Sequence, residues 1–285
     1  MISMTRFSKL RALTGATVVA AAITTALPMA AQAAVACNET ALVAAINAAN
    51  AAGGGNVVLT PGCVYTLTTP HAIGANGPDG LPIITTVITL TGNNNIITRS
   101  TALRTPAFRI AEVSSTGNFT LKQVTLNRGL AVGSGGGVLN FGALTLTGSG
   151  LTNNTATGTG GGLSNADVPA PGTGTAATFT SSHVSGNTAS GRGAGIYNGL
   201  RGTLTTTSSS VKTNMSLLAQ GGGIAAINST ATTFTSTPIS ANDATLGAGG
   251  VYRLGGTMTV TTSPITGNTP NNCVGSSPPV PSCTN

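Results

Sequence analysis

The sequence predicts an all-β fold, a single-stranded parallel β-helix (a solenoid) of about seven to eight coils over residues 83–270, with an N-terminal capping helix. Three observations predict it. An apolar residue recurs with a period in the twenties, an Asn follows it at a constant offset, and a Gly cluster leads into a second recurrent apolar residue. Each coil then has an inward apolar row that it can bury only by stacking on its neighbours.

The first repeated feature is an apolar residue that anchors each coil. Successive anchors are 27, 27, 33, 27, 28 and 26 residues apart. The 33-residue interval contains the Pro- and Gly-rich segment 166–174, which we expect to be an outward insertion that leaves the coil intact. The anchors are Ile97, Val124, Leu151, Val184, Val211, Ile239 and Ile265.

An Asn stands three residues after six of the seven anchors. At a corner of a coil, such a side chain can point inside and hydrogen-bond to the Asn of the next coil, because its amide both donates and accepts. The pattern therefore predicts a buried ladder. Its members are Asn127, Asn154, Asn187, Asn214, Asn242 and Asn268.

A Gly cluster precedes the second recurrent apolar residue. Gly tolerates the tight or left-handed backbone that a corner requires. These clusters do not predict phosphate-binding loops, because they recur with the coil and no helix or Lys-Ser/Thr pair follows them. The second recurrent residues are Val138, Leu163, Ile196, Ile224 and Val251.

Residues 1–33 have the order of a secretory signal peptide. A short basic region opens the chain, an apolar run follows to about residue 27, and Ala31 and Ala33 are suited to cleavage after residue 33. A membrane anchor is the alternative, but the run is short for a span. Lipidation at Cys37 is a further alternative, although the usual Leu three residues earlier is absent. We expect a secreted or cell-surface protein with no membrane span after cleavage.

Residues 34–82 are predicted to form an N-terminal cap. Apolar positions at helical spacing predict a helix over 41–50, with Asn38 as its N-cap and a Gly run from Gly53 as its end. An amphipathic helix here would cover the open core and strand edges of the first coil. The two strands and the loop that follow are expected at 56–60, 63–67 and 68–82.

The four cysteines lie near the two ends of the predicted solenoid. In an exported protein, Cys37 and Cys63 would pair across the helix–strand unit. Cys273 and Cys283 would pin a proline-rich closure over residues 271–285. All four cysteines are then structural, and we expect no metal and no cofactor.

The best copy of the repeat, residues 184–198, reads Val-Ser-Gly-Asn-Thr-Ala-Ser-Gly-Arg-Gly-Ala-Gly-Ile-Tyr-Asn. It resembles the paired repeat of the polymorphic outer-membrane type, an aromatic or apolar residue-x-x-Asn followed by Gly-Gly-x-Ile, with the aromatic replaced by Val, Leu or Ile. Such repeats occur in right-handed parallel β-helix proteins of the pectate-lyase-like superfamily, including exported bacterial proteins. The resemblance extends over roughly residues 37–273 and implies a right-handed coil, but this fold carries lyases, hydrolases, adhesins and tail spikes alike.

The acidic residues are too few and too scattered for hydrolysis of a polysaccharide. Glycoside hydrolysis needs two neighbouring carboxyl groups, and metal-assisted elimination needs several Asp around a cation. After cleavage, nine basic and five acidic residues leave a net charge of +4 without a basic run, so nucleic-acid binding gains no support. The acidic residues are Glu39, Asp79, Glu112, Asp167 and Asp243.

A lyase without a metal could use Arg, Lys, Tyr or His alone. Alignment of the repeats places Asp167, Arg201 and Arg253 near one corner of nearby coils. Tyr197 and Tyr252 each follow the second recurrent apolar residue and should point outwards. On such a face, tyrosines could stack on sugar rings and arginines could pair with an acidic glycan. The alternative is a surface salt bridge between Asp167 and Arg201 beside two ordinary exposed tyrosines. In the best repeat, only Arg192 and Tyr197 are left to face outwards. The five candidates are Tyr197, Arg201, Tyr252, Arg253 and Asp167.

Threonines flank the buried positions of several predicted strands, as at Thr145, Thr147, Thr178 and Thr180. Such rows resemble flat ice-binding or adhesive faces in other solenoids. Ordinary inward–outward alternation along a strand also produces them, and the sequence favours this simpler interpretation.

We therefore expect an exported, monomeric β-helix protein that acts at the cell surface or outside the cell as a binding or structural module, without catalysis. The expected partner is an extracellular polysaccharide or a component of the cell envelope. The alternative is a polyuronate lyase, which would require acidic and basic residues to converge on one groove.

Overall fold

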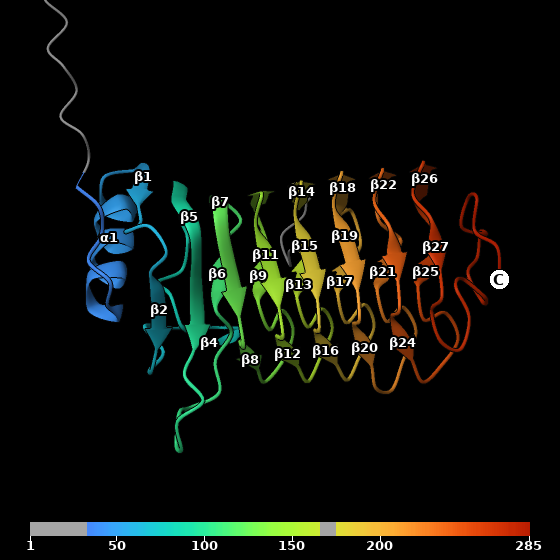
Figure 1. Cartoon of the computed structure of the whole chain (residues 1–285), viewed down its shortest axis with the longest axis horizontal. Helices are drawn as coiled ribbons and strands as arrows, with labels where there is room; N and C mark the ends of the chain where they lie inside the picture. Colours follow the sequence, from blue (N-terminus) through green and yellow to red (C-terminus); the bar gives the residue numbers. More distant parts are fainter. Residues whose placement is uncertain (1–32, 166–174) are drawn as a thin grey trace, which may run out of the picture. The chain divides into compact units, whose positions relative to one another are not determined.

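The structure, a computed structural model, describes residues 33–165 and 175–285. These residues form a parallel β-solenoid of about seven turns, in which strands pair with their equivalents in the next coil (Figure 1). The predicted all-β solenoid is confirmed, and its right-handed sense stays a prediction. The predicted signal peptide up to residue 32 and the predicted insertion 166–174, with Asp167, lie outside the described residues.

Each full coil passes twice through a first sheet, once through a second sheet and once through a third. The first sheet contains β1 (Gly54–Val58), β2 (Val64–Leu67), β5 (Val87–Arg99), β7 (Asn118–Asn127), β10 (Ala143–Thr147), β11 (Gly150–Thr152), β14 (Ala176–Thr180), β15 (His183–Ser185), β18 (Thr203–Thr207), β19 (Ser210–Lys212), β22 (Ala231–Thr235), β23 (Ile239–Ser240), β26 (Thr257–Thr261) and β27 (Ile265–Thr266). The second contains β8 (Leu130–Ala131), β12 (Thr155–Ala156), β16 (Thr188–Ala189), β20 (Met215–Ser216) and β24 (Asp243–Ala244). The third contains β6 (Ala111–Val113), β9 (Val138–Asn140), β13 (Leu163–Asn165), β17 (Ile196–Asn198), β21 (Ile224–Ile227) and β25 (Val251–Leu254).

The helix α1 (Glu39–Ala51) lies at the first end of the solenoid, beside β1 and β2 (Figure 1). Its N-cap is Asn38, whose side chain accepts a hydrogen bond from the backbone nitrogen of Ala41 at 2.8 Å. Leu42 and Ile46 are fully buried against the core. The helix therefore has the place and the apolar face that the sequence predicts for a cap.

Inward side chains of successive coils stack in rows. In the first sheet, Leu146, Phe179, Thr206 and Phe234 are in register on consecutive strands, and all four are buried. Thr206 is the polar member of this row, and its hydroxyl donates to Thr237 Oγ1 at 3.1 Å. Its polar atom is thus satisfied inside the core, as buried polar groups generally are.

The second coil differs from the predicted alignment by two residues. Leu126, and not Val124, pairs with Leu151 in the next coil. Val124 instead lies opposite Asn95 of the preceding coil. Both Val124 and Leu126 are buried. Because side chains alternate with a period of two, a shift of two residues keeps the same face inward, so the apolar pattern could not distinguish these registers.

The predicted loop 68–82 contains an antiparallel hairpin made of β3 (Ala72–Gly74) and β4 (Gly77–Asp79). Gly77 has a φ of 104°, a left-handed value that suits Gly after the hairpin turn. The prediction of a loop was wrong for these residues because three-residue strands that contain Gly and Pro carry little period-two signal.

Glu39 at the start of α1 fixes the segment that leads into this hairpin. Its carboxylate accepts hydrogen bonds from the backbone nitrogen of Thr68 at 2.9 Å and from the Thr68 hydroxyl at 2.6 Å. His71 Nε2 lies 2.7 Å from Glu39 Oε1. Burial acts to raise the pKa of Glu39, but the hydrogen bonds from Thr68 and His71 outweigh it and lower that pKa. The cap helix therefore holds the hairpin as well as the core.

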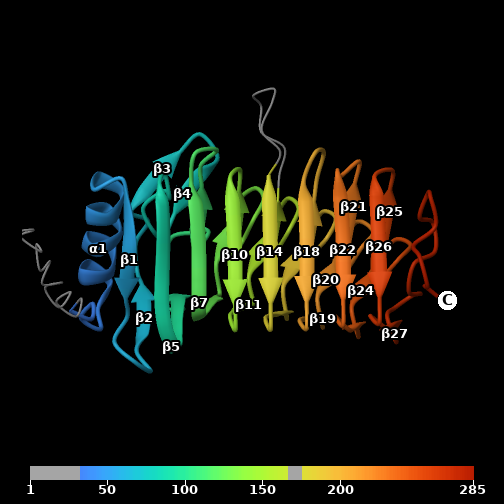
Figure 2. The same cartoon turned by 90° about the horizontal axis from the view of Figure 1, so that it is seen from above.

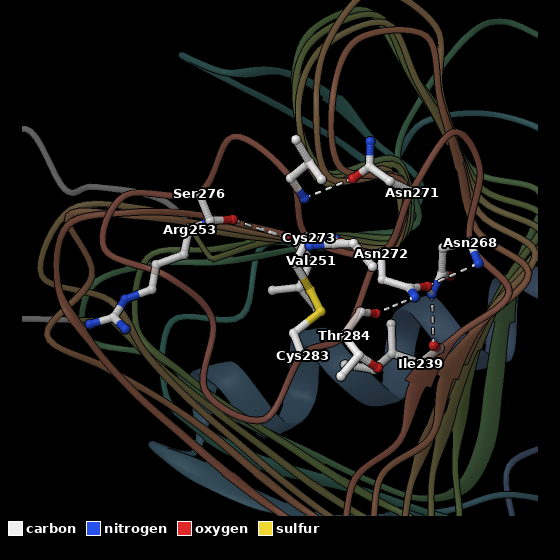
Figure 3. Close-up of a disulfide and its surroundings, with 12 residues drawn as sticks. Ile239, Val251, Arg253, Asn268, Asn271, Asn272, Cys273, Ser276, Cys283 and Thr284 are labelled. Carbon is white, nitrogen blue, oxygen red and sulfur yellow. Dashed lines mark hydrogen bonds between the residues drawn. A yellow bond between two sulfur atoms is a disulfide. The ribbon is translucent and has the colours of Figure 1, made fainter.

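Both predicted disulfides are present, one near each end of the solenoid. Cys37–Cys63 joins the residue before the N-cap of α1 to the residue before β2. Cys273–Cys283 closes the segment after the last coil (Figure 3). There, the backbone nitrogen of Cys273 also donates to Asn285 Oδ1 at 2.7 Å.

Candidate functional site

Five of the six asparagines proposed as a ladder form one chain of side-chain hydrogen bonds. The Nδ2 atom of each donates to the Oδ1 atom of the next at 2.9–3.0 Å. The last member, Asn268, donates in the same way to Asn272 Oδ1 at 2.9 Å. Every amide in the middle of the ladder both donates and accepts, so its buried polar atoms are satisfied. The five members are Asn154, Asn187, Asn214, Asn242 and Asn268.

Asn127 is not part of this ladder. It is half-buried at the end of β7, and its Oδ1 accepts from Asn153 Nδ2 at 3.2 Å. The first rung is Asn154, whose Oδ1 accepts from the backbone nitrogen of Gly129 at 2.8 Å. The two-residue shift of the second coil explains the difference, since the position equivalent to Asn154 falls beyond Asn127 in that coil.

A second buried amide ladder lies in the third sheet and was missed at the sequence level. Asn140 Nδ2 donates to Asn165 Oδ1 at 2.7 Å, and Asn165 Nδ2 donates to Asn198 Oδ1 at 2.7 Å. The chain ends on Thr232 Oγ1, 2.9 Å from Asn198 Nδ2. The available signal was an Asn two residues after the second recurrent apolar residue in three successive coils.

Arg253 does not belong to an outward glycan face. It is in register with the core residue Ala226, is 9% exposed, and donates to the carbonyl oxygens of Gly255 at 3.3 Å and Pro279 at 3.1 Å. It therefore holds the C-terminal closure against the last coil. The prediction that Arg253 shares a face with Tyr252 is corrected, because consecutive residues of a strand point to opposite faces.

Tyr197 and Tyr252 lie on one side of the third sheet, each in register with Ala225. Two coil spacings separate their Cα atoms by about 10 Å. Tyr252 is 8% exposed. The guanidinium carbon of Arg192 lies 5.6 Å from the centroid of its ring, and Arg192 Nε donates to Gln220 Oε1 at 3.0 Å. The Tyr252 ring is thus covered by Arg192 rather than open to a sugar.

Arg201 is exposed in the turn after β17. Its backbone has a φ of 60°, and its backbone nitrogen donates to the carbonyl oxygen of Asn228 at 3.3 Å. Asp167, its proposed partner, lies outside the described residues. Among the described candidates, the structure aligns the two tyrosines on one side of the third sheet and engages Arg253 with the C-terminal closure.

A buried ionic cluster joins the β3–β4 hairpin to the second coil. Arg109 Nη1 lies 2.8 Å from Asp79 Oδ1 and 3.2 Å from Glu112 Oε2. Arg109 Nη2 donates to the carbonyl oxygen of Asn76 at 2.5 Å, and Asn76 Nδ2 donates to Glu112 Oε1 at 3.2 Å. This cluster was not predicted, because Asp79 falls within the predicted loop 68–82. The separation of 30 residues between Asp79 and Arg109, close to one coil, was the available signal.

The cluster has two carboxylates for one guanidinium, all inside the protein. Burial raises the pKa of Asp79 to about 7, Arg109 opposes this, and Glu112 adds to it. Within the described structure, Asp79 Oδ2 makes no hydrogen bond. Asp79 and Arg109 are 0% and 1% exposed, so a polymeric substrate cannot reach them. The cluster therefore acts as a structural junction.

The outward side of the first sheet carries two adjacent ranks of threonine, which we name the threonine face. Thr89 and the residues in register with it on the following strands are Thr in all seven coils. The rank two residues further on is Thr in six coils and Lys122 in one. The first rank is Thr89, Thr120, Thr145, Thr178, Thr205, Thr233 and Thr259. The second is Thr91, Lys122, Thr147, Thr180, Thr207, Thr235 and Thr261.

Every residue of the threonine face is half-buried or exposed. The hydroxyl of Thr91 donates to Asn56 Oδ1 at 2.7 Å. Within the described part of the chain, the other hydroxyls of the face make no hydrogen bond to protein. Figure 2 shows the strands that carry them, from β5 to β26, side by side in one row. The face is thus an ordered array of solvent-facing hydroxyl and methyl groups.

Comparisons with protein-family models, curated proteins and solved structures found no match. Over residues 33–165 and 175–285, no helix is long and apolar enough to cross a membrane. The same residues contain no group of three or more His, Cys, Asp or Glu that could hold a metal ion.

Proposed function

We propose that this chain is an exported β-solenoid that acts outside the cell or at its surface as a non-catalytic binding or structural module. The observation that carries the proposal is the threonine face, because it is the same in coil after coil and its hydroxyls are directed to solvent. A surface that repeats at a constant interval suits a partner that also repeats, such as a polymer or a solid.

The charged residues support a non-catalytic role. Glu39 holds the entry to the hairpin, and Asp79 and Glu112 are buried against Arg109. Arg253 is engaged by backbone carbonyls of the C-terminal closure. Each of these groups already has a structural partner, so the convergence of acidic and basic groups that a lyase needs is not supported.

Export is supported by the signal-peptide pattern of residues 1–33 and by the two disulfides, which suit an oxidising compartment. We further propose that the chain is a monomer and that its coil is right-handed, since parallel crossover connections almost always have that hand. The resemblance of the repeat to pectate-lyase-like β-helix proteins with polymorphic outer-membrane-type repeats supports a bacterial origin.

The function is tested by two assays on the purified exported chain. Incubation with a panel of soluble polyuronates is expected to yield no unsaturated product by ultraviolet absorbance, and a clear signal would refute the non-catalytic role. Co-sedimentation with insoluble polysaccharides and uptake into slowly growing ice are expected to show binding to at least one of these repetitive solids. Binding to none of them would refute the role of the threonine face.

A further inference from the structure

We propose that the threonine face binds the surface of crystalline ice, so that this chain is an ice-binding protein. The inference rests on the proposed function, in which the threonine face is the contact surface, and it names the material that this surface recognises. The sequence alone favoured ordinary alternation as the origin of the threonines. The register across seven coils goes beyond alternation, because alternation requires outward residues to be polar but not to be the same residue in every coil.

The spacing of the hydroxyls forms a two-dimensional lattice. Neighbouring strands are about 4.8 Å apart, and residues two apart on one strand are separated by about 6.6 Å. Because Thr145, Thr178 and Thr205 are in register without a bulge, the spacing between coils repeats along the whole rank. Hexagonal ice is likewise a lattice of oxygen atoms that donate and accept hydrogen bonds and recur at constant spacings. An array of this kind can therefore match many lattice sites at once.

The chemistry of the face also suits frozen water. Each threonine presents a hydroxyl, which both donates and accepts as a water molecule does, beside a methyl group that orders the water around it. Over the two ranks, Lys122 is the one ionisable side chain. From β10 to β26 the face is uncharged, so water can order on it without first solvating ions.

The core beneath the threonine face holds the strands that carry it in place. Buried side chains such as Leu146, Phe179 and Phe234 lie between the two ranks and fill the core beneath them. Threonine is β-branched, so its χ1 angle has few accessible states on a strand. Little side-chain entropy is then lost when the array meets a rigid lattice.

An insoluble polysaccharide is the competing partner and is less favoured. Sugar recognition commonly uses aromatic rings as stacking platforms, and neither rank of the threonine face contains an aromatic residue. Tyr197 and Tyr252 lie in the third sheet instead. The neutral hydroxyl–methyl array is therefore matched to a water lattice rather than to sugar rings.

The experiment measures uptake of the folded exported chain into a slowly growing ice hemisphere and its effect on the shape of single ice crystals. The double variant T178K/T205K places two charges in the centre of the first rank. The control is T188K, which places a single lysine on β16 in the same coil as Thr178 but in the second sheet. Lys122 shows that the first-sheet backbone accepts a lysine at the face. Circular dichroism and melting temperature verify that both variants fold.

The unchanged chain is expected to enter the ice and to produce faceted crystals. T178K/T205K is expected to reduce uptake by at least about tenfold, since simultaneous contacts along the array are interrupted, whereas T188K leaves uptake unchanged. Lys122→Thr, which completes the second rank, is expected to increase uptake.

Exclusion of the folded chain from ice would overturn the inference. Equal loss of uptake in T178K/T205K and T188K would also overturn it, because the effect would not belong to the face. If the chain is excluded from ice but sediments with an insoluble polysaccharide, and T178K/T205K abolishes that binding, the ice assignment fails while the proposed function stands. If it binds neither material, both fail.

Discussion

The first coils and the later coils of this solenoid are held together by different chemistry. Around the hairpin, charged groups of unlike kind meet once, as Asp79, Arg109 and Glu112 do. From β10 to β27, neutral groups of the same kind repeat, as the Asn154–Asn187 rungs do. A side chain that recurs in every coil lies next to an identical side chain in the neighbouring coil, so the two must be able to pair with each other. A contact that is made only once has no such neighbour and can therefore use charged groups.

Asparagine meets that requirement because its amide donates and accepts. Each rung satisfies the next, whatever the number of coils. A buried charge repeated at the coil spacing of about 4.8 Å would instead repel its copy. At the hairpin there is no identical neighbour above or below, so an arginine can bind two carboxylates and fasten an irregular element.

The largest effect is expected when the ionic junction is broken. Arg109→Met leaves Asp79 and Glu112 buried without their guanidinium, and we expect it to lower the free energy of unfolding by about 4 kcal/mol, as measured by urea unfolding at neutral pH. Arg201→Met, at an exposed arginine, serves as the control and should change stability by less than about 0.5 kcal/mol. Similar losses in the two variants would contradict the structural role of Arg109.

The two disulfides should differ according to the length of chain that they close. Cys37–Cys63 spans 26 residues and Cys273–Cys283 spans 10. Replacing each pair by serine should lower stability by about 3.5 and about 3 kcal/mol respectively, because the longer loop restricts the unfolded chain more. Thermal unfolding of the two double variants checks this order. An unchanged melting temperature in either variant would show that its bridge does not stabilise the fold.

The amide ladder gives a smaller loss at a single rung. Asn187→Ala removes hydrogen bonds to Asn154 and Asn214 and leaves buried polar groups unpaired, so we expect a loss of about 2–3 kcal/mol. Asn127→Ala, outside the ladder, should cost less than about 1 kcal/mol. Urea unfolding of the two variants compares them. A loss for Asn127→Ala as large as for Asn187→Ala would contradict the register of the second coil.

The smallest effect concerns pH. The pKa of Asp79 is about 7 in the folded chain and 3.8 for an unperturbed group, so the stability that protonated Asp79 contributes is fully present below about pH 4 and is lost progressively as the pH rises to about 7. We expect the free energy of unfolding to fall by about 1 kcal/mol between about pH 6 and pH 8. Asp79→Asn should remove this dependence, and the same pH profile in that variant would assign it to another group.

Much of the fold could be predicted because the repeat consists of short sequence patterns that recur at a nearly constant interval. The helical spacing around Leu42 and Ile46, with Asn38 before it, was sufficient for the cap. The recurrence of Asn three residues after an apolar anchor predicted a ladder that Asn187 and its neighbours form. Such features need only short stretches of sequence and a constant period.

The candidate site was harder to predict. Tyr252 and Arg253 were assigned to one surface although adjacent strand residues alternate, and Arg253 instead binds Pro279 in the C-terminal closure. Arg192, which covers the Tyr252 ring, was recognised as outward-facing but not as its partner. These contacts depend on which loops fold back over a strand. A short sequence pattern does not indicate where a distant loop will lie.

The sequence by itself determined the solenoid, its cap and its amide ladder, because the period and the alternation of side chains follow from backbone geometry alone. The tertiary structure decided the register of the second coil, since a shift of two residues leaves the buried face unchanged. It also decided the meeting of Asp79 with Arg109 and the alignment of Thr89 through Thr259 into one face. Both contacts depend on which residue of one coil lies beside which residue of the next coil. The stacking of the coils in the folded protein determines this register.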